Sequence, residues 1–371
     1  MKWLFWISAL LILYAYMGYP ALLFLRSRWA PVAVPRSSAL PPLSIVMAVH
    51  NGATLLPAKL ENLSELDYPA ELVEVIVVSD GSSDGTNQIL QDWQGERRRA
   101  IILPKNEGKA VALNCAVEAA SCDMLVLTDA RQMIDRNALR YLAQNFEDSD
   151  VACVSGELIL KETRPGASTA GLGLYWEFEK KIRQWESDTG SVVGVTGALY
   201  AARKQFVPLL PAGTLLDDVY IPVYAAGRGK RVLFESRALS YDSLSDGRRE
   251  FWRKVRTLAG NYQLLQLAPW LVTSNNPIRF RFASHKLTRL LVPFALLGIL
   301  VSAVFLDSPL YRLALASELA LCLGAVLGAI RLPLGFLSRP GNACAAFLVL
   351  NAAALVAFAY FVTGRRVAWT R

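Results

Sequence analysis

Histidine and cysteine are scarce in this chain of 371 residues, which contains two histidines and five cysteines. His50 and His285 stand far apart, and no two cysteines form a C-x-x-C pair. A zinc site needs several thiolate or imidazole ligands at close spacing, and a disulfide framework needs regularly spaced cysteines. The sequence supports neither, so we expect reduced cysteines with a structural role.

Charged residues are absent from positions 3–25, an apolar run long enough to cross a hydrocarbon core of roughly 30 Å at about 1.5 Å per residue. Further apolar runs lie near 290–306, 310–330 and 343–363, whereas 40–245 has an ordinary soluble composition. We expect one N-terminal spanning helix, a globular domain and about three C-terminal spanning helices. A cleaved signal peptide is the alternative for the first run, but its apolar region is usually shorter.

Positive charge, +8 in total at neutral pH, is concentrated beside the apolar runs. Lys2 precedes the first run while Arg26, Arg28 and Arg36 follow it, so the positive-inside rule predicts a cytoplasmic globular domain. Nine Lys and Arg lie between positions 248 and 289, directly before the C-terminal runs. Anionic lipid headgroups explain this placement better than nucleic acid does. We therefore expect a lipid bilayer as partner and no nucleic acid.

A proline-rich linker at 29–42 leads into alternating apolar and amphipathic segments. The apolar runs predict strands at 43–49, 73–80, 100–104 and 124–129. The segments between them predict helices at 54–66, from the turn GSSDGT through 93, and at 107–120. Such alternation predicts a mostly parallel sheet with right-handed crossovers, which binds ligands at the carboxyl ends of its strands.

Polar residues follow three of the predicted strands and are expected to meet at one edge of the sheet. They are His50 and Asn51, Asp80, and Asp129. Asp80 can accept hydrogen bonds from a ribose or a base, and the next turn offers backbone N–H groups to an anion. An Asx turn that caps the following helix is the alternative. Lys109 can meet a diphosphate or be an ordinary surface lysine.

Seven motifs in this chain resemble those of family 2 glycosyltransferases and occur in the same order. They are LSIVMAVHN, VIVVSDGSSDGT, NEGKAVALN, LVLTDA, GVTGALYAAR at 194–203, LLDDV at 215–219 and RKVRTLAGNYQ at 253–263. The resemblance spans about 40–263, and the C-terminal helices look like those of the branch that makes cellulose, hyaluronan and poly-N-acetylglucosamine.

That resemblance implies a GT-A fold, an α/β architecture with a Rossmann-like, mostly parallel sheet. It also implies transfer from a nucleoside diphosphate sugar with inversion, by single displacement. Asp80 matches the nucleoside-contacting aspartate, Lys109 the lysine near the nucleotide, and Asp129 the first aspartate of the D-x-D metal motif. Asp218 matches the general base.

Sugar transfer requires chemical groups of the same kinds. An acceptor hydroxyl is a weak nucleophile, so a carboxylate must take its proton, and Asp218 is the candidate. Asp217 can raise the pKa of Asp218 or orient it, and the two are coupled. The leaving diphosphate needs a cation that stabilises its developing charge. A loop pair that only caps the following helix is the alternative interpretation of the two aspartates.

The metal motif departs from the family pattern, because Arg131 stands in place of the second aspartate. Mg²⁺ or Mn²⁺ can be held by Asp129 alone with substrate phosphates. Alternatively, Arg131 supplies positive charge to the diphosphate directly, as a planar fork suited to phosphate oxygens. A surface Arg131 paired with Asp135 is the third interpretation.

The Q-x-x-R-W motif of processive synthases reads R-K-V-R-T at 253–257, without its glutamine and tryptophan. Arg253 and Arg256 can still meet the acceptor or diphosphate, but a stacking platform must come from elsewhere, such as Trp252 or Tyr262. We expect Gly197 and Ala198, with Gly194, to form tight backbone beside the acceptor, although core glycines would look the same. Sugar transfer is therefore better supported than processive extension.

Two further segments lie next to the membrane. Residues 176–187 form an amphipathic helix, expected either on the acceptor side or packed on the membrane face. Residues 268–287 mix aromatic and basic side chains, which suits an interfacial element. Three C-terminal spans would leave the last arginines outside, against the positive-inside rule, so one span can be re-entrant. Glu318 makes the span at 310–330 the suspect.

We therefore expect an integral membrane protein, of a bacterial inner membrane by inference, that builds a cell-surface glycan on a glycan or lipid-linked acceptor from a UDP-sugar. The expected divisions are a membrane helix at 1–28, a linker at 29–42, a GT-A domain at 43–265, an interfacial segment at 266–289, membrane helices at 290–363 and a tail at 364–371. The alternatives are a polyprenyl-phosphate sugar transferase and an inactive scaffold that binds nucleotide sugar.

Overall fold

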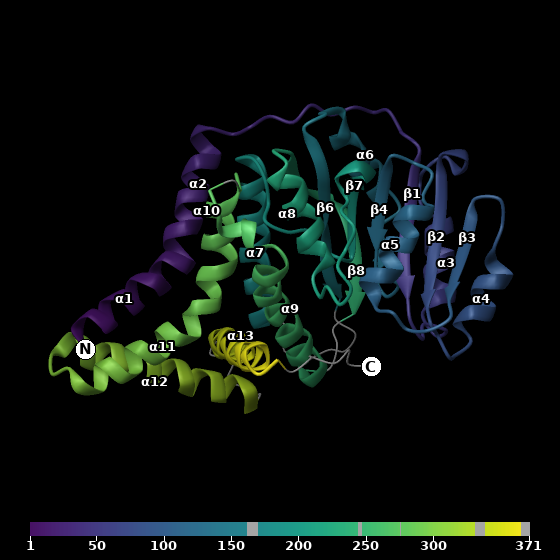
Figure 1. The fold of residues 1–371 in the computed structure, drawn as a ribbon. Helices are drawn as coiled ribbons and strands as arrows, with labels where there is room; N and C mark the ends of the chain where they lie inside the picture. Colours follow the sequence, from purple (N-terminus) through teal and green to yellow (C-terminus); the bar gives the residue numbers. More distant parts are fainter. Residues whose placement is uncertain (162–169, 244–246, 275, 331–337, 365–371) are drawn as a thin grey trace.

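A sheet domain occupies one end of the molecule and a group of apolar helices the other (Figure 1). The structure is a computed structural model that describes residues 1–161, 170–243, 247–274, 276–330 and 338–364. Two long helices, α7 (Ala170–Asp188) and α9 (Gly247–Leu267), lie between the two ends. The expected terminal arginines at 365–371 lie outside the described residues.

The domain is built on one eight-stranded sheet with the order β3-β2-β1-β4-β7-β6-β8-β5. The strands are β1 (Leu43–Val49), β2 (Val73–Asp80), β3 (Arg98–Leu103), β4 (Met124–Thr128), β5 (Met133–Ile134), β6 (Val151–Lys161), β7 (Leu199–Arg203) and β8 (Arg231–Ser243). The first four pair in parallel, as predicted, and β7 joins β4 in the antiparallel direction. Central strands are buried on both faces, which explains why β1 and β2 read as continuous apolar runs.

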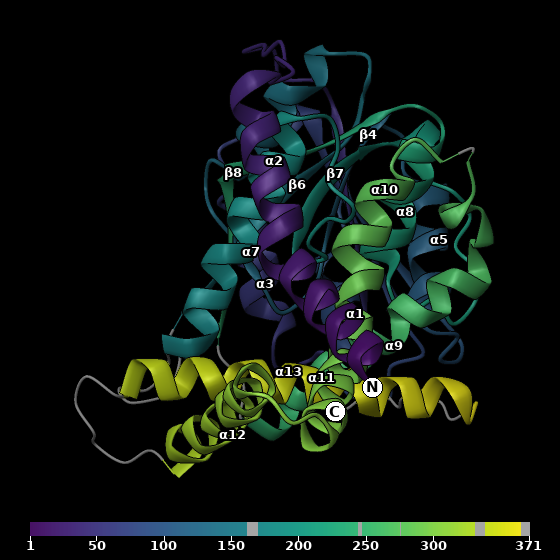
Figure 2. The ribbon, with the colours of Figure 1, turned by 90° about the vertical axis from the view of Figure 1, so that its left-hand side faces the viewer.

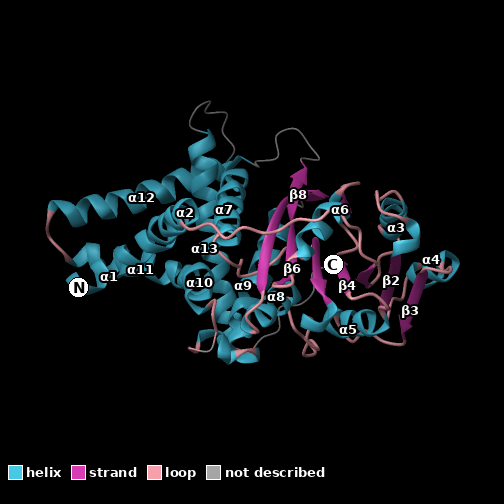
Figure 3. Cartoon of the chain, turned by 90° about the horizontal axis from the view of Figure 1, so that it is seen from above, coloured by secondary structure: helices cyan, strands magenta, loops and turns pink. Residues whose placement is uncertain are grey.

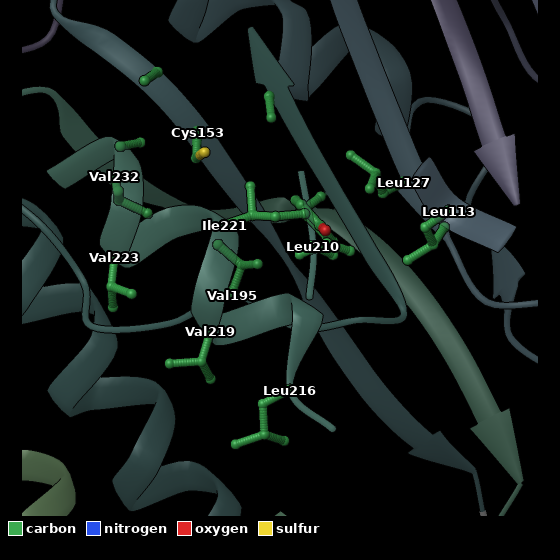
Figure 4. Packing of buried hydrophobic residues seen from close by; sticks show 14 of the residues in the cluster. Leu113, Leu127, Cys153, Val195, Leu210, Leu216, Val219, Ile221, Val223 and Val232 are labelled. Atoms are coloured by element: carbon green, nitrogen blue, oxygen red, sulfur yellow. The ribbon is translucent and has the colours of Figure 1, made fainter. Parts of the chain in front are cut away.

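Helices cover both faces of this sheet (Figure 3). They are α3 (Leu56–Ser64), α4 (Thr86–Trp93), α5 (Lys109–Ala119), α6 (Ala138–Ala143) and α8 (Asp217–Gly227). One buried cluster holds side chains of α5 and α8, and a second holds those of α3 and α6. Figure 4 shows Val219, Ile221 and Val223 of α8 among the side chains of the first cluster. Helix α8 contacts β6 and β8, and this packing fixes the position of its first residue.

Four helical runs among the described residues are long and apolar enough to cross a membrane. They are Lys2–Trp29, Arg279–Phe305, Pro309–Leu327 and Pro340–Val362. The first comprises α1 (Lys2–Leu13), a π-helical turn η1 (Tyr14–Gly18) and α2 (Tyr19–Trp29), and the last lies within α13 (Ser338–Val362). The chain therefore carries one such helix at its N-terminus and three after the sheet domain, as expected.

The second of these runs begins earlier than the sequence indicated. Helix α10 (Arg279–Phe282), the π-helical turn η6 (Ala283–Leu287) and α11 (Thr288–Phe305) follow one another without interruption. Residues 279–289, expected in an interfacial segment, thus form the first turns of an apolar helix. Their basic side chains are compatible with this because several find partners inside the protein.

The described part of α12 (Pro309–Ile330) forms a helix without a break, and α13 packs against it. In Figure 2, α11, α12 and α13 gather at one end of the molecule. A re-entrant segment at 310–330 would need a bend that returns the chain to the same side. The uninterrupted α12 does not support that alternative.

Candidate functional site

Lys109 lies at the centre of the predicted site. Its ammonium is 2.8 Å from Asp129 Oδ1, just beyond β4, and 3.1 Å from Asp217 Oδ1, the first residue of α8. Gly108 is the residue before α5 and has a φ of +93°, a conformation that glycine adopts without steric cost. The turn of the backbone at Gly108 leads directly into Lys109, the first residue of α5. Burial disfavours the charged form of Lys109, but Asp129 and Asp217 outweigh it and raise its pKa. Lys109 is therefore a permanent cation between the two carboxylates.

Asp217 and Asp218 occupy different environments. Asp217 is 5% exposed and paired with Lys109, whereas Asp218 is only partly buried. A Cβ atom placed on Gly197 would lie 3.4 Å from Asp218 Oδ2 and 3.6 Å from Asp129 Oδ2, so the missing side chain keeps both oxygens accessible. Burial, followed by the charge of Asp217, raises the pKa of Asp218 to about 6. A carboxylate with this pKa can accept a proton near neutral pH.

Asp80 holds the turn that leads to Lys109. Its two carboxylate oxygens accept hydrogen bonds from the backbone N–H groups of Glu107 at 2.7 Å and Gly108 at 2.9 Å. A Cβ atom on Gly81 would lie 2.2 Å from the backbone nitrogen of Asn106, so only glycine lets these two turns touch. Asp80 thus links the end of β2 to the start of α5, in addition to any ligand contact.

His50 and Asn51 lie beside Asp80, as predicted. His50 Nδ1 is 2.7 Å from the Asp80 carbonyl oxygen, and Asn51 Oδ1 accepts a hydrogen bond of 2.8 Å from the Ser83 backbone. The turn after Asp80 is closed by Asp84, whose carboxylate accepts the Thr86 backbone N–H at 3.0 Å at the start of α4. The Asx turn expected of Asp80 is thus made by Asp84, because the Asp80 carboxylate is bound to the backbone of Glu107 and Gly108.

Arg131 pairs with Asp242 near the end of β8 and not with Asp135, so the predicted surface pair was wrong. Gln132 donates a hydrogen bond of 2.9 Å to the same carboxylate, and Asp135 instead accepts one from Tyr241 at 3.2 Å. Burial and then the nearby Arg253 lower the pKa of Arg131, although Asp242 opposes them. Arg131 and Arg253 therefore lie close together on the Asp129 side of the site.

Comparison with known proteins identifies the domain that holds these residues. The family model described as Glycosyl transferase family 2 matches residues 44–207. This chain carries a family 2 glycosyltransferase domain. The matched residues include His50, Asn51, Asp80, Lys109 and Asp129, and the motif resemblance of the sequence is thereby confirmed.

Two relatives of this chain are a glycosyltransferase and a polysaccharide synthase by name. The chain is 24% identical over 293 residues to a probable glycosyltransferase of Bacillus subtilis, covering 75% of this chain and 69% of that protein. It is also 24% identical over 229 residues to a poly-beta-1,6-N-acetyl-D-glucosamine synthase of Staphylococcus aureus, covering 60% of this chain and 55% of that protein. The chain thus spans about half the length of the second relative.

A solved structure has the same fold. A mannosyltransferase from Pyrobaculum calidifontis, in complex with GDP-Man and Mn²⁺, superimposes with a TM-score of 0.75 at 22% sequence identity. The match covers 98% of this chain and all of that one, so it includes the apolar helices. The predicted GT-A fold, with helices long and apolar enough to cross a membrane at both ends, is confirmed. With the family match and the relatives above, the chain is a glycosyltransferase.

Two residues of the glycosyltransferase site were not predicted. Lys59 on α3 is fully buried, and its ammonium donates to Thr128 Oγ1 at 3.0 Å and to the Gln132 carbonyl at 2.5 Å, beneath the Asp129 loop. Burial lowers its pKa to about 7, although Asp129 opposes this. The signal in the sequence was a lysine on the apolar face of α3, at helical spacing from Leu56 and Leu63.

Tyr200 on β7 is the second of these residues. It is 1% exposed, and its hydroxyl has no hydrogen-bond partner among the described residues. Burial, followed by the charges of Asp217 and Asp218, raises its pKa well above the ordinary value. The phenol therefore stays protonated beside the acidic residues of the site. Nothing in the sequence distinguishes it from other strand tyrosines.

The glycines predicted on the acceptor side lie next to Asp218, whereas the arginines predicted there lie on α9. Gly194 and Gly197 flank Asp218, and Val195 donates a backbone hydrogen bond of 2.9 Å to the Asp218 carbonyl. The carbonyl of Ala198 accepts a 2.7 Å hydrogen bond from Thr128, which ties β7 to the end of β4. Arg253 and Arg256 lie on α9, and both have interactions within the protein.

The aromatic residues proposed as a sugar-stacking platform face the apolar helices instead. Tyr262 is 9% exposed and stacks on Phe361 of α13 with ring centroids 5.3 Å apart. Trp252 meets Tyr360 edge-on at 6.1 Å. Because α9 lies on α13, the ring of Tyr262 is occupied by packing, and the expectation that it stacks on a sugar was wrong.

The site offers a divalent metal ion one protein carboxylate, that of Asp129. Within the described residues, no group of three or more His, Cys, Asp or Glu side chains could hold an ion. The side chain of Asp129 is 37% exposed, and its Oδ2 lies on the open side above Gly197. Mg²⁺ and Mn²⁺ are commonly bound through one or two carboxylates with phosphates and water. Asp129 and a diphosphate therefore suffice as ligands.

Proposed function

We propose that this glycosyltransferase moves a sugar from a nucleoside diphosphate sugar to an acceptor at the bilayer, with inversion at the anomeric carbon. The observation that supports this most directly is Asp218, an accessible carboxylate with a pKa of about 6 next to Asp129. In the proposed reaction, the acceptor oxygen bonds to the anomeric carbon as the bond to the diphosphate breaks. Asp218 takes the proton of the acceptor, and the nucleoside diphosphate leaves.

The other residues then have separate roles. His50, Asn51 and Asp80 border the nucleoside, and Lys109 with Asp129 borders the diphosphate. Arg131, Arg253 and Arg256 supply further positive charge to phosphate oxygens, as planar donors do well. Asp217 keeps Lys109 in place and raises the proton affinity of Asp218. Such preorganised charges stabilise a leaving group without reorganising during the reaction.

Mg²⁺ or Mn²⁺ is the proposed cofactor. When bound by Asp129 and the diphosphate, the ion supplies Lewis-acid stabilisation of the leaving group. The presence of Mn²⁺ in the mannosyltransferase of Pyrobaculum calidifontis supports this assignment. Arg131 forms an ion pair with Asp242. This ion pair would have to break before Arg131 could take the place of the metal at the diphosphate.

The donor and location are proposed as follows. We take a UDP-sugar as the first candidate and a GDP-sugar as the second, because the solved mannosyltransferase holds GDP-Man. Residues 43–265 act on the cytoplasmic side of a bacterial inner membrane, connected through 29–42 to the helix at 1–28. Residues 266–278 lead into the apolar helical runs that begin at Arg279.

Two classes of acceptor are compatible with this site: a growing glycan, in cell-surface polysaccharide synthesis, and a polyprenyl phosphate. The packing of Tyr262 against α13 favours the second, since this buried ring is not available to stack on a saccharide. An inactive scaffold that binds nucleotide sugar is the alternative of another class.

The test is the release of nucleoside diphosphate by the purified full-length protein across a panel of nucleotide sugars, with and without Mn²⁺. Release with one donor class, stimulated by metal, is the expected result and names the donor. Binding of a nucleotide sugar without release, in the presence of membrane-extracted acceptors, would favour the scaffold.

A further inference from the structure

A buried ionic cluster fixes the turn η6 against α7 and α2. His285 in this turn contacts Glu186 through Nδ1 at 2.9 Å and Glu179 through Nε2 at 3.1 Å, and it is 4% exposed. Arg289 pairs with Glu179, and the hydroxyl of Tyr19 donates to Glu186 at 2.6 Å. These contacts place the residue that directly follows His285 at a defined position.

That residue is Lys286, which is directed to the region of Asp218. Its ammonium lies 3.8 Å from the position that a Cβ atom on Gly194 would take, and the Asp218 carbonyl oxygen lies 3.8 Å from the same position. Lys286 is partly buried, yet it has no hydrogen bond or ion pair with any residue in the described ranges. A cation held in a fixed, partly desolvated position is costly unless a ligand compensates its charge.

Arg183 on α7 is a second partly buried cation in this region. It lies one turn after Glu179 and one turn before Glu186, on the same helix face. The charge of Arg183 acts on Lys286 by repulsion, and those of Glu179, Asp218 and Glu186 act on it by attraction. Arg183 likewise has no hydrogen bond or ion pair with the described part of the chain. Glu179 and Glu186 are already engaged by His285 and Arg289. Arg183 and Lys286 thus keep their hydrogen-bond donors available to a ligand, and phosphate is the anion that Arg and Lys bind best together.

The position of these cations indicates which substrate carries the phosphate. The residues assigned to the donor, Lys109 and Asp129, lie on the carboxylate side of Asp218, beside Gly197. Lys286 lies on its carbonyl side, beside Gly194. An anion at Lys286 would therefore lie beside Asp218 near Gly194, away from Gly197, where the carboxylates of Asp218 and Asp129 meet.

The surroundings indicate a lipid. Lys286 lies in the apolar helical run Arg279–Phe305, and an exposed apolar stripe begins little more than one turn after it. The stripe consists of Leu291, Phe294, Leu297 and Val301, each at least 36% exposed. A hydrocarbon chain can lie along this stripe while its phosphate reaches Lys286 and Arg183.

We propose that Arg183 and Lys286 bind the phosphate of a lipid-linked acceptor and hold it beside Asp218. The inference rests on the proposed function and adds the residues that would hold the acceptor's phosphate. Two sources share this chemistry: a polyprenyl monophosphate, whose own oxygen would attack the sugar, and a lipid diphosphate saccharide, whose hydroxyl would attack. Bilayer phospholipid is the third source of phosphate and must be separated from both.

The experiment uses the full-length protein in nanodiscs of zwitterionic lipid, with polyprenyl phosphate, polyprenol and a polyprenyl diphosphate saccharide as probes. Binding is measured by native mass spectrometry and transfer by the labelled lipid product. Lys286→Gln and Arg183→Gln are compared with Lys286→Arg, which keeps the charge. Exposed cations on the same two segments provide the matched controls Arg279→Gln and Lys181→Gln.

We expect polyprenyl phosphate or the diphosphate saccharide, and not polyprenol, to bind the wild-type protein. Lys286→Gln and Arg183→Gln should each weaken that binding and raise KM for the lipid by at least about tenfold, with an unchanged Kd for the nucleoside diphosphate. Lys286→Arg should restore most of the affinity. Which of the two lipids responds identifies the source of the phosphate.

Three results would overturn the proposal. One is equal binding of polyprenol, or unchanged lipid binding in both Gln variants. Another is an equal loss in Arg279→Gln, which would assign the effect to bilayer charge, and the third is a matching loss of nucleotide affinity. Lipid binding is scored separately from transfer, so binding without any nucleoside diphosphate release would contradict the proposed function and leave this site standing. Release without lipid binding would do the reverse.

Discussion

The ammonium of Lys109 lies 3.1 Å from a carboxylate oxygen of Asp217, and this ion pair separates the roles of two adjacent aspartates. Asp217 is buried and compensated, whereas Asp218 has no such partner within the described chain and has its pKa raised to about 6. A base must be deprotonated before it can act, so the pair predicts a specific pH dependence.

The acid limb of kcat/KM against pH should have an apparent pKa near 6, with activity falling as the pH drops below it. Replacement of Asp217 by Asn removes the second cause of the raised pKa of Asp218. The acid limb of Asp217→Asn should therefore move to lower pH, while staying above the ordinary aspartate value because burial remains. A limb that moves to higher pH in this variant would contradict the assignment.

Gly197 should be required for activity and not for folding. An alanine Cβ would lie 3.4 Å from Asp218 Oδ2 and 3.6 Å from Asp129 Oδ2, an ordinary contact distance that nevertheless fills the space between the two carboxylates. We expect Gly197→Ala to lower kcat by about tenfold to a hundredfold, since small displacements of reacting groups have effects of this size. Gly95→Ala is the control, because nothing lies within 4 Å of its added Cβ. Equal kcat values for the two variants would argue against this placement.

Lys59 should make stability depend on alkaline pH. Its pKa is about 7 in the folded protein and near 10.5 when unfolded, so the unfolded chain binds more protons between these values. The free energy of unfolding therefore rises with pH across that window, by at most about 1.4 kcal/mol per pH unit. Below pH 7 Lys59 is charged in the folded protein as well, and the full free-energy cost of burying its charge applies. Lys59→Met should remove this slope from Tm measured in detergent between pH 7 and 10. An unchanged slope would show that Lys59 is not desolvated.

Metal dependence should act through Asp129. Chelation with EDTA should suppress nucleoside diphosphate release, and Mn²⁺ or Mg²⁺ should restore it. Asp129→Asn should raise the metal concentration needed for half-maximal activity by at least about tenfold, because Asp129 is the one carboxylate assigned to the ion. Full activity in EDTA would instead assign the diphosphate to Arg131 and its neighbours.

The main elements of the sheet domain followed from local patterns. Continuous β-branched runs fixed β1 and β2 at 43–49 and 73–80, and glycine-rich turns marked the polar strand ends. What local patterns could not supply were contacts between distant segments. One interpretation paired Arg131 with Asp135, four residues away, although its partner Asp242 comes from β8. Lys59 acquires its role only through its contact with β4.

The helical region shows the same limit. Apolar length predicted the four candidate spans, but not that α9 would pack on α13 and occupy Tyr262. The cluster around His285 joins residues about a hundred positions apart, from α7 and η6. Since a basic segment before an apolar run resembles an interfacial element, its burial became evident only in the structure.

The central claim is that Asp218 takes the proton of the acceptor, and the most direct measurement compares the wild-type protein with Asp218→Asn. Nucleoside diphosphate release is followed at saturating donor and metal, and nucleotide affinity is measured in parallel. The account predicts a kcat at least about a hundredfold lower in Asp218→Asn, with nucleotide Kd within about twofold of wild type. A kcat close to that of the wild type would contradict it and remove Asp218 from the chemistry.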